Sequence, residues 1–552
     1  MAIAPLCHRS LSPLLLFAAG LAFSAPALAA ELYVSTSGND SSGTGTLQNP
    51  YRTVKRAISA GRAGDTITLR APANNRTYNE CDVRLRQRMT LQTYAGEGKA
   101  RIHCAITTAD TVTIQIDPAA SGSRLSNLEI SGGYYYGIML QTNWYQGGPA
   151  SDTGASDVVL EDLLIHSTGR DGIKITPKSN RATIRRVEIH TTGARDSSNA
   201  DGIDNVNADG MVVEDSYIHD TATTGMYFKG GARDVVVQRN RVENTGDAGI
   251  LVGFDTSVEF FDLSVNPQYY ESIRGIVRNN VVRNTGYSGI GMYASKDAIV
   301  ANNTIINAGR LGHSAIYFGV TFQDWDPNAG RPANINPTLR NNLVIQSNNR
   351  CVEIRYSSEL GGLSGLSGSP NSNWNGFGNG CVFRDGRPGS TVTAGTLAQW
   401  RSGTGADANS KQAAFSVDAN GRLPAGSPAI DAGTTLAQVT DDIDRQTRAA
   451  PFDLGADEYG QQSTAPIRVN GVQPLVPVRG SSAASGAVTA GSLPATTAAP
   501  VTPTASTSST PAATTPAAVP AVRPAAKPVS RTYTAPAIKA WYWLLSWIDR
   551  LR

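Results

Sequence analysis

The sequence predicts an all-β protein, a right-handed parallel β-helix in which short strands stack coil upon coil. The main observation is a recurring step of a small residue followed by an aliphatic one, with glycines at Gly137, Gly172, Gly202, Gly225, Gly249 and Gly289. These glycines are 35, 30, 23, 24 and 40 residues apart. A period near 23 residues with insertions is typical of a solenoid of parallel strands. The right-handed form is expected because right-handed crossovers are the rule for parallel strands.

A second series of short aliphatic strands runs in parallel with the first, starting near residues 128, 163, 187, 216, 241, 281, 304 and 343. Asn often precedes these strands, as in Asn279-Asn280 and Asn302-Asn303. Asn and Gly tolerate left-handed backbone angles, so both are expected at the corners between strands. Stacked Asn side chains could also satisfy the backbone groups there. The longer steps indicate loops at 254–273 and 320–336.

The ends of the solenoid need covers that hide their unpaired edges. Residues 54–60 have helical spacing and precede an expected strand at 65–69, so we expect this helix to cap the first coil. The segments 426–433, 442–445 and 452–459 are expected to close the other end, and their acidic residues are interpreted as turn chemistry. The β-helix domain with its two caps is therefore placed at residues 31–460.

Residues 1–30 are expected to be a signal peptide. His8 and Arg9 precede an apolar run from Leu14 to Phe23, and Ala27-Leu28-Ala29 fits a small-residue cleavage site. The run is too short to cross a membrane, so the protein is expected to be secreted or periplasmic. Four cysteines follow the signal, and an oxidising compartment favours disulfides among Cys81, Cys104, Cys351 and Cys381. Free buried thiols are the alternative.

The C-terminal part has a different composition from the rest of the chain. Residues 461–535 are dominated by Ala, Pro, Thr and Ser, which predicts a disordered linker. Residues 536–552 form a short aromatic segment that is cationic at its edges. It is interpreted as an amphipathic helix on a membrane surface or a partner protein, with a frayed tail as the equal alternative. The net charge is +3 and the basic residues are dispersed, so nucleic-acid binding has no support. We expect a monomer.

Two series of charged residues fall at equivalent places in neighbouring coils. Asp171 and Asp201 directly precede the glycine of their step, and Lys174, Asp204 and Tyr227 follow theirs by two residues. Equivalent positions stack about 4.8 Å apart, so Asp204 is expected between Lys174 and Tyr227. Stacked carboxylates repel unless a cation neutralises them, and oxygen ligands suit calcium. The alternative is that each Asp is an ordinary corner residue and that Lys174 pairs with Asp204.

Lys229 follows its step glycine by four residues, which places it one coil on from Asn205 and Val206. It is flanked by aromatic residues and would lie near the bound cation. Both features disfavour an ammonium group, so Lys229 is a candidate general base. A solvated lysine before a Gly-Gly corner is the alternative.

Part of this region carries a resemblance to a known family. The resemblance rests on Asp201-Gly202-Ile203-Asp204, on a strand ending in Asp215-Ser216, and on Phe228-Lys229-Gly230-Gly231. They resemble the calcium-dependent polysaccharide lyases of family nine, which are right-handed parallel β-helices of the pectate-lyase-like superfamily. The resemblance implies that Asp201 and Asp204 bind Ca2+, that Lys229 is the Brønsted base, and that Asp171 is a third ligand.

The resemblance covers residues 196–255, and it has two departures. Ala200 stands where the family has the first Asp of a pair, so Asn199 or Asp209 would have to substitute. The residue that the family has between the Lys and the Gly-Gly pair is also absent.

The function implied is a secreted lyase that cleaves an acidic, uronate-containing polysaccharide by calcium-assisted β-elimination. Side chains expected to contact this substrate are Lys174, Lys178, Arg195, Tyr227 and Arg239. Two classes of alternative stay open. One is another β-helix enzyme acting on carbohydrate, a C5 epimerase or a hydrolase, and the other is a non-catalytic glycan-binding or adhesin β-helix.

Overall fold

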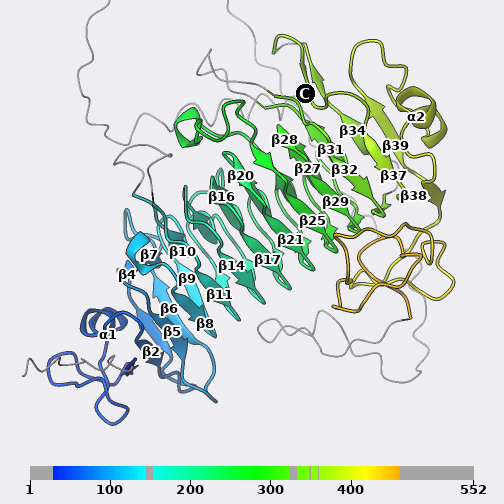
Figure 1. The fold of residues 1–552 in the computed structure, drawn as a ribbon. Coiled ribbons are helices and arrows are strands. Elements are labelled where there is room, and N and C mark those ends of the chain that lie inside the picture. The colour runs from blue at the N-terminus through cyan, green and yellow to red at the C-terminus, as the bar shows by residue number, and fades with distance from the viewer. Residues whose placement is uncertain (1–28, 144–152, 322–331, 347–349, 359, 461–552) are drawn as a thin grey trace, which may run out of the picture. The chain divides into compact units, whose positions relative to one another are not determined.

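The computed structural model describes residues 29–143, 153–321, 332–346, 350–358 and 360–460. Within them the chain winds into a parallel β-helix, and successive strands of one coil belong to three different sheets (Figure 1). The expected fold class is therefore confirmed. The predicted signal peptide up to residue 28, the linker 461–535 and the segment 536–552 lie outside the described residues.

Three long sheets, here named A, B and C, make up the coils. Sheet A consists of β1 (Glu31–Val34), β2 (Thr66–Leu69), β5 (Thr90–Thr93), β8 (Arg124–Ser126), β11 (Val159–Glu161), β14 (Thr183–Arg185), β17 (Val212–Glu214), β21 (Val236–Gln238), β25 (Ile276–Arg278), β29 (Ile299–Ala301), β32 (Thr338–Arg340) and β37 (Asn371–Asn373). Sheet B consists of β3 (Thr77–Asn79), β6 (Ala100–Cys104), β9 (Leu128–Gly132), β12 (Leu164–His166), β15 (Glu188–His190), β18 (Tyr217–His219), β22 (Arg241–Glu243), β26 (Val281–Arg283), β30 (Thr304–Ile306), β33 (Leu343–Ile345), β38 (Gly376–Gly378) and β40 (Lys411–Ala413).

Sheet C carries the steps found in the sequence. It consists of β4 (Val83–Leu85), β7 (Ile114–Ile116), β10 (Ile138–Leu140), β13 (Ile173–Ile175), β16 (Ile203–Val206), β19 (Met226–Lys229), β23 (Ile250–Val252), β27 (Ile290–Tyr293), β31 (Ile316–Gly319), β34 (Arg350–Ile354) and β39 (Val382–Asp385). Smaller elements are the parallel strands β20 (Ala232–Arg233), β24 (Ser272–Ile273) and β28 (Ser295–Lys296), the antiparallel pair β35 (Tyr356–Ser357) and β36 (Leu363–Ser364), and the 3-10 turns η1 (Pro118–Ala120) and η2 (Val258–Phe260).

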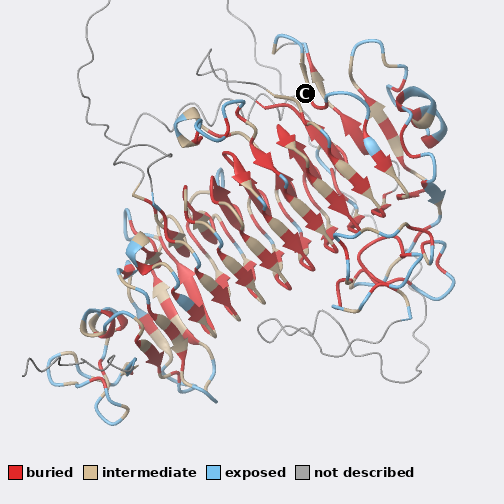
Figure 2. Cartoon of the chain, viewed as in Figure 1, coloured by how far each residue is buried: buried red, intermediate tan, exposed pale blue. Residues whose placement is uncertain are grey.

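Aliphatic side chains stacked inside the coils hold the sheets together. In sheet C, Ile173, Ile203, Met226 and Ile250 are paired in register on successive strands, and all four are fully buried. Burying one such side chain contributes about 1.5–3 kcal/mol. Figure 2 shows buried residues along the strands of every coil. The same stacking fixes which side chains of neighbouring coils lie opposite each other on the outer face.

The step glycines are required for a different reason from the one expected. Gly172 and Gly202 do not have positive φ angles. A Cβ on Gly202 would lie 2.4 Å from the carbonyl oxygen of Gly225 and 2.5 Å from Ile218 Cγ2. Close packing between sheets B and C therefore excludes a side chain there. The left-handed corner positions are filled mainly by Asp and Asn, with Asn279 (φ 56°) as an example.

Asparagine side chains form the expected ladder at one corner of the coils. Asn240, Asn280, Asn303 and Asn342 lie on successive coils, and each Nδ2 donates to Oδ1 of the next at 3.0 Å, ending on Asn375 at 3.1 Å. The same side chains also bond to backbone groups, for example Asn280 Nδ2 to the Val237 carbonyl at 3.0 Å. The ladder therefore satisfies buried corner groups, as the sequence pattern indicated.

Helices cover the two ends of the coils. Helix α1 (Val54–Ala60) begins after Thr53, whose hydroxyl accepts from the Arg56 N–H, and it buries Val54, Ala57 and Ile58 beside the first strands. Helix α2 (Leu397–Thr404) lies against β39, the last strand of sheet C, where buried Trp400 packs on Phe383 (Figure 1). Neither helix, nor any other among the described residues, is long and apolar enough to cross a membrane.

The segment after β40, residues 414–460, is called the strap here. It runs along the side of the coils, which corrects the expectation that its parts close the end. Ile443 and Ala456 pack on Val281, and the Asn302 side chain donates to the Asp453 carbonyl at 3.1 Å. The apolar side chains of the strap thus pack on the outside of coils that are already stacked.

The four cysteines form two disulfides, as expected for an oxidising compartment. Cys81 is bonded to Cys104, and Cys351 is bonded to Cys381. The insertion at 254–273 is described in full, while most of the one at 320–336 lies outside the described residues.

Candidate functional site

Three carboxylates converge at the start of two neighbouring strands of sheet C. Asp171 precedes β13, Asp201 precedes β16, and Asp204 lies within β16. One oxygen of each side chain lies within 4.8 Å of the others, and all three residues are buried, with 1–2% exposure. The step glycines bring the two strands to this register, so the sequence-predicted carboxylate group is assembled by the fold.

Two carboxylate oxygens of this acidic cluster have no hydrogen-bond partner. Asp171 Oδ1 accepts the N–H of Asp201 at 3.0 Å. Asp201 Oδ1 accepts the Thr223 hydroxyl at 2.7 Å and the Thr224 N–H at 2.9 Å. Asp171 Oδ2 and Asp204 Oδ1 are buried and have no hydrogen-bond partner. Burying carboxylate oxygens without a hydrogen-bond donor is costly. A cation bound by these oxygens would remove that cost, so the cluster has the features of a cation site.

Lys174 supplies one positive charge to the cluster. It stands opposite Asp204 in the register of β13 and β16, and its Nζ forms an ion pair with Asp204 Oδ2. Burial disfavours its ammonium form, but Asp204 and its other neighbours outweigh burial and raise the pKa of Lys174. The pairing that the sequence left as an alternative is thus present, together with the clustering of the three carboxylates.

The carboxylates also affect one another. Burial, followed by the charges of Asp204 and Asp201, raises the pKa of Asp171 well above its usual value. Burial and Asp204 raise the pKa of Asp201 to about 6. Tyr227 faces Asp204 on the next strand, and burial with the nearby carboxylates raises the pKa of its hydroxyl. Three carboxylates with one ammonium therefore form a site that favours a further positive charge.

Lys229 lies at the end of β19, opposite Val206 as expected. Its Nζ donates to the Asp255 carbonyl at 2.9 Å and lies 4.4 Å from the ring centre of Tyr227 and 5.4 Å from that of Phe254. The residue is 8% exposed. A neutral lysine amine can make the same bond to Asp255 and still keep a lone pair, so this contact orients the amine.

The insertion 254–273 is anchored beside Lys229 by a residue that sequence reasoning missed. Glu271 is fully buried, and its carboxylate accepts the Gly230 N–H at 2.8 Å, the Thr256 hydroxyl at 2.7 Å and the Thr256 N–H at 3.1 Å. Burial outweighs these bonds and raises the pKa of Glu271 to about 8. No periodic signal marks Glu271, because it lies inside the insertion.

Three of the remaining residues expected to contact substrate, Lys178, Arg195 and Tyr227, lie near the acidic cluster. Lys178 follows β13 and pairs with Asp262 of the insertion at 2.5 Å. Arg195 lies in the segment leading to β16, its guanidinium 3.9 Å from the ring centre of Tyr134. Tyr227 is buried beneath Lys229. These residues lie around the acidic cluster or at the ends of its strands.

Arg239 is not at this site, which corrects the expectation from sequence. It lies at the corner between sheets A and B and is buried against Glu214, Asp215 and Asp441, at 2.6–2.9 Å. Arg239 is only ten residues after Lys229 in the sequence, but by then the chain has left sheet C and reached another face of the coil. Arg239 ties the strap to the coils.

At position 200, the lyases that the motif resembles have an Asp, whereas this chain has a buried alanine that offers no ligand. Ala200 is fully buried, and its N–H donates to Thr223 Oγ1 at 3.0 Å. Asn199 is exposed. Asp209 lies beyond the other end of β16 and pairs with Arg233 at 2.5 Å, so the expectation that it could substitute is wrong.

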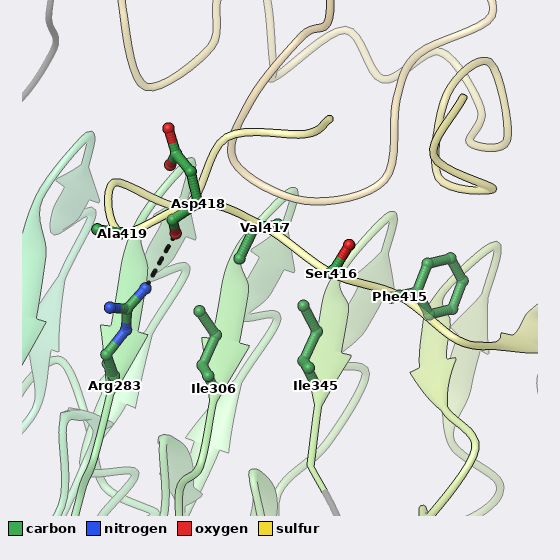
Figure 3. A pocket seen from close by; sticks show the side chains of 8 residues that line it. All are labelled: Arg283, Ile306, Ile345, Phe415, Ser416, Val417, Asp418 and Ala419. Carbon is green, nitrogen blue, oxygen red and sulfur yellow. Dashed lines mark hydrogen bonds between the residues drawn. The ribbon is translucent and has the colours of Figure 1, made fainter. Parts of the chain in front are cut away.

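A hollow on another face is unrelated to the acidic cluster. It lies between Arg283, Ile306 and Ile345 of sheet B and residues 415–419 of the strap. Figure 3 shows these side chains, with Arg283 Nη2 donating to the Asp418 carbonyl at 3.3 Å. Its lining is largely apolar and presents no group of converging carboxylates.

Comparison with known proteins agrees with the fold. Residues 112–268 and 150–325 match the family model described as a right handed beta helix region, so the right-handed β-helix expected from the sequence is confirmed. No curated protein matches the sequence.

Similar solved structures include pectate lyase Pel9A, at 14% identity over 78% of this chain and 96% of that chain, with a TM-score of 0.49. An alginate lyase from Paenibacillus sp. str. FPU-7 is 14% identical over 55% of this chain and 93% of its own, with a TM-score of 0.39. The A-module of Azotobacter vinelandii mannuronan C-5 epimerase AlgE6 is 12% identical over 66% and 94%, with a TM-score of 0.40.

Proposed function

We propose that this protein is a polysaccharide lyase that cleaves a uronate-containing polymer by β-elimination. The observation that carries the proposal is the buried group of Asp171, Asp201 and Asp204, with two partnerless oxygens, one coil away from the amine of Lys229. Acidic oxygens beside an oriented amine are the pair of features that proton abstraction next to a carboxylate requires.

The three carboxylates would hold Ca2+, whose preference for oxygen ligands fits this donor set. When bound, the cation draws charge from a substrate carboxylate and makes the neighbouring C5 proton more acidic. Lys174 pairs with one of the three carboxylates. The ammonium and a divalent ion together would therefore neutralise three carboxylate charges without excess.

Lys229 has the role of base in this proposal. Its Nζ lone pair takes the C5 proton, the C5–H electrons form the C4–C5 double bond, and the bond from C4 to the glycosidic oxygen breaks. The leaving oxygen takes a proton from water. The Asp255 carbonyl holds the amine in place, and Glu271 fixes both the backbone after Lys229 and Thr256, next to Asp255.

A non-catalytic glycan-binding β-helix is the second candidate, and a specific observation favours it. Lys174 occupies one oxygen of Asp204, and the insertion at 254–273 lies directly on Lys229. A coil whose carboxylate and lysine are already engaged with neighbouring residues could bind a polymer without cleaving it.

One experiment separates the two. The protein is incubated with a panel of polyuronates, with calcium or with chelator, and the ultraviolet absorbance of the 4,5-unsaturated product is followed. A calcium-dependent rise on one polymer supports the lyase and identifies its substrate. Binding of a polymer without any unsaturated product would support the glycan-binding protein instead.

A further inference from the structure

A second group of carboxylates lies in the strap, on a different face from the first. Asp442, Asp444 and Asp457 each offer an oxygen within 4.8 Å of the others, and their exposures are 0%, 4% and 2%. From the sequence alone, these acidic residues are interpreted as parts of turns. The turn is present, because Asp442 Oδ1 accepts the N–H groups of Asp444 at 2.9 Å and Gln446 at 2.7 Å.

The turn does not satisfy all of the carboxylate oxygens. Asp444 Oδ2 is held by Arg422, whose Nε and Nη2 lie at 2.9 and 2.8 Å. Asp444 Oδ1 is buried and has no hydrogen-bond partner. Since Arg422 occupies the other oxygen, Oδ1 is the atom left to face the two neighbouring carboxylates. A buried oxygen in this position needs a donor or a cation.

Nearby guanidinium groups are largely engaged elsewhere. Arg448 pairs with Glu458 at 2.9 Å, and Arg445 pairs with Asp215 of the coils. Arg422 thus pairs with Asp444, one of the three carboxylates of this group.

We propose that Asp442, Asp444 and Asp457 bind a calcium ion that stabilises the strap. The donor set is entirely carboxylate oxygen, which suits a hard divalent cation, and water would complete the coordination. The flanking residues attach this part of the strap to the coils. Asp441 pairs with Arg239 at 2.6 Å and accepts from Asn279 at 2.8 Å, and Ile443 packs on Val281. The ion therefore acts on stability, and the chemistry at Lys229 does not depend on it.

The test is the calcium dependence of thermal unfolding of the full chain carrying D201N, a substitution that weakens the first acidic cluster. Calcium at about 100 times its Kd should raise the Tm by about 3 °C. Adding D444N should abolish this rise, because Asn keeps an oxygen for Arg422 and turns an amide toward the other carboxylates. The matched control is D431N, which alters an exposed carboxylate of the same strap and should leave the rise intact.

In chelator, the D444N variant should be close to its parent in stability, because the removal of one of three clustered carboxylate charges offsets the weakened pairing with Arg422. A calcium response in D444N equal to that of its parent would overturn the proposal, and so would the absence of any response in D201N. Calorimetric titration of D457N gives an independent readout. It should lack one calcium-binding event of the wild type, and a full stoichiometry in D457N would also overturn the proposal.

Discussion

Lys174 and Asp204 face each other on neighbouring strands of sheet C, and their ion pair uses only one of the two Asp204 oxygens. The other oxygen and Asp171 Oδ2 are buried without a partner. One ammonium thus faces three clustered carboxyl groups and pairs with one of them, Asp204. This arrangement reconciles two interpretations that the sequence had set against each other, the ion pair and the cation site.

Lys174→Gln should strengthen calcium binding at the acidic cluster. The substitution removes a positive charge next to a ligand, and such a charge at about 4 Å is worth about 1–4 kcal/mol at effective dielectric constants between water and a protein surface. We expect Kd to fall by about tenfold or more, measured by calorimetric titration.

The control for this prediction is Lys411→Gln, which alters an exposed lysine at the end of sheet B and should leave Kd unchanged. If Lys174→Gln instead lowered stability and gave no tighter calcium binding, Lys174 would itself be the permanent counter-ion of the cluster.

Gly202→Ala should destabilise the coil that carries the cluster. The new Cβ would meet the Gly225 carbonyl oxygen at 2.4 Å and Ile218 Cγ2 at 2.5 Å, and overpacking of this kind costs about 1–3 kcal/mol. Gly98→Ala is the matched control, since its Cβ would meet nothing within 4 Å. Chemical denaturation of both variants measures the difference, and equal stability of the two would contradict the packing argument.

Glu271 should make the stability of the protein depend on pH. Its folded pKa is raised from 4.5 to about 8, so the folded state binds a proton more tightly than the unfolded chain. The resulting contribution to stability is full below about pH 4.5, is lost as pH rises, and is gone above about pH 8.

Glu271→Gln lacks this titration. The free energy of unfolding of the wild type minus that of the variant should therefore fall across this window and level off above it. Denaturation curves at several pH values give this difference directly. Parallel pH dependence in the two proteins would show that Glu271 does not titrate there.

The periodic part of the molecule was predictable from sequence because each coil repeats the same stacking. The step glycines place Asp204 between Lys174 and Tyr227, and they place Lys229 opposite Val206. Counting from each glycine was enough to predict these neighbours, since residues in register on parallel strands must lie side by side.

Contacts outside the repeat were not predictable in this way. Glu271 belongs to an insertion, and its partner Gly230 is 41 residues away. Arg445 of the strap pairs with Asp215, 230 residues earlier, and no spacing rule links them. Arg239 was misplaced for a related reason, because its position depends on which of three sheets the chain has entered.

The central claim is that Lys229 is the base of a β-elimination, and it is tested most directly by Lys229→Ala. Formation of unsaturated product on the polymer that the wild type cleaves should fall by about 100- to 10,000-fold, while polymer binding and calcium binding persist. Lys411→Ala should retain full activity. Product formation by Lys229→Ala at the wild-type rate would contradict the account.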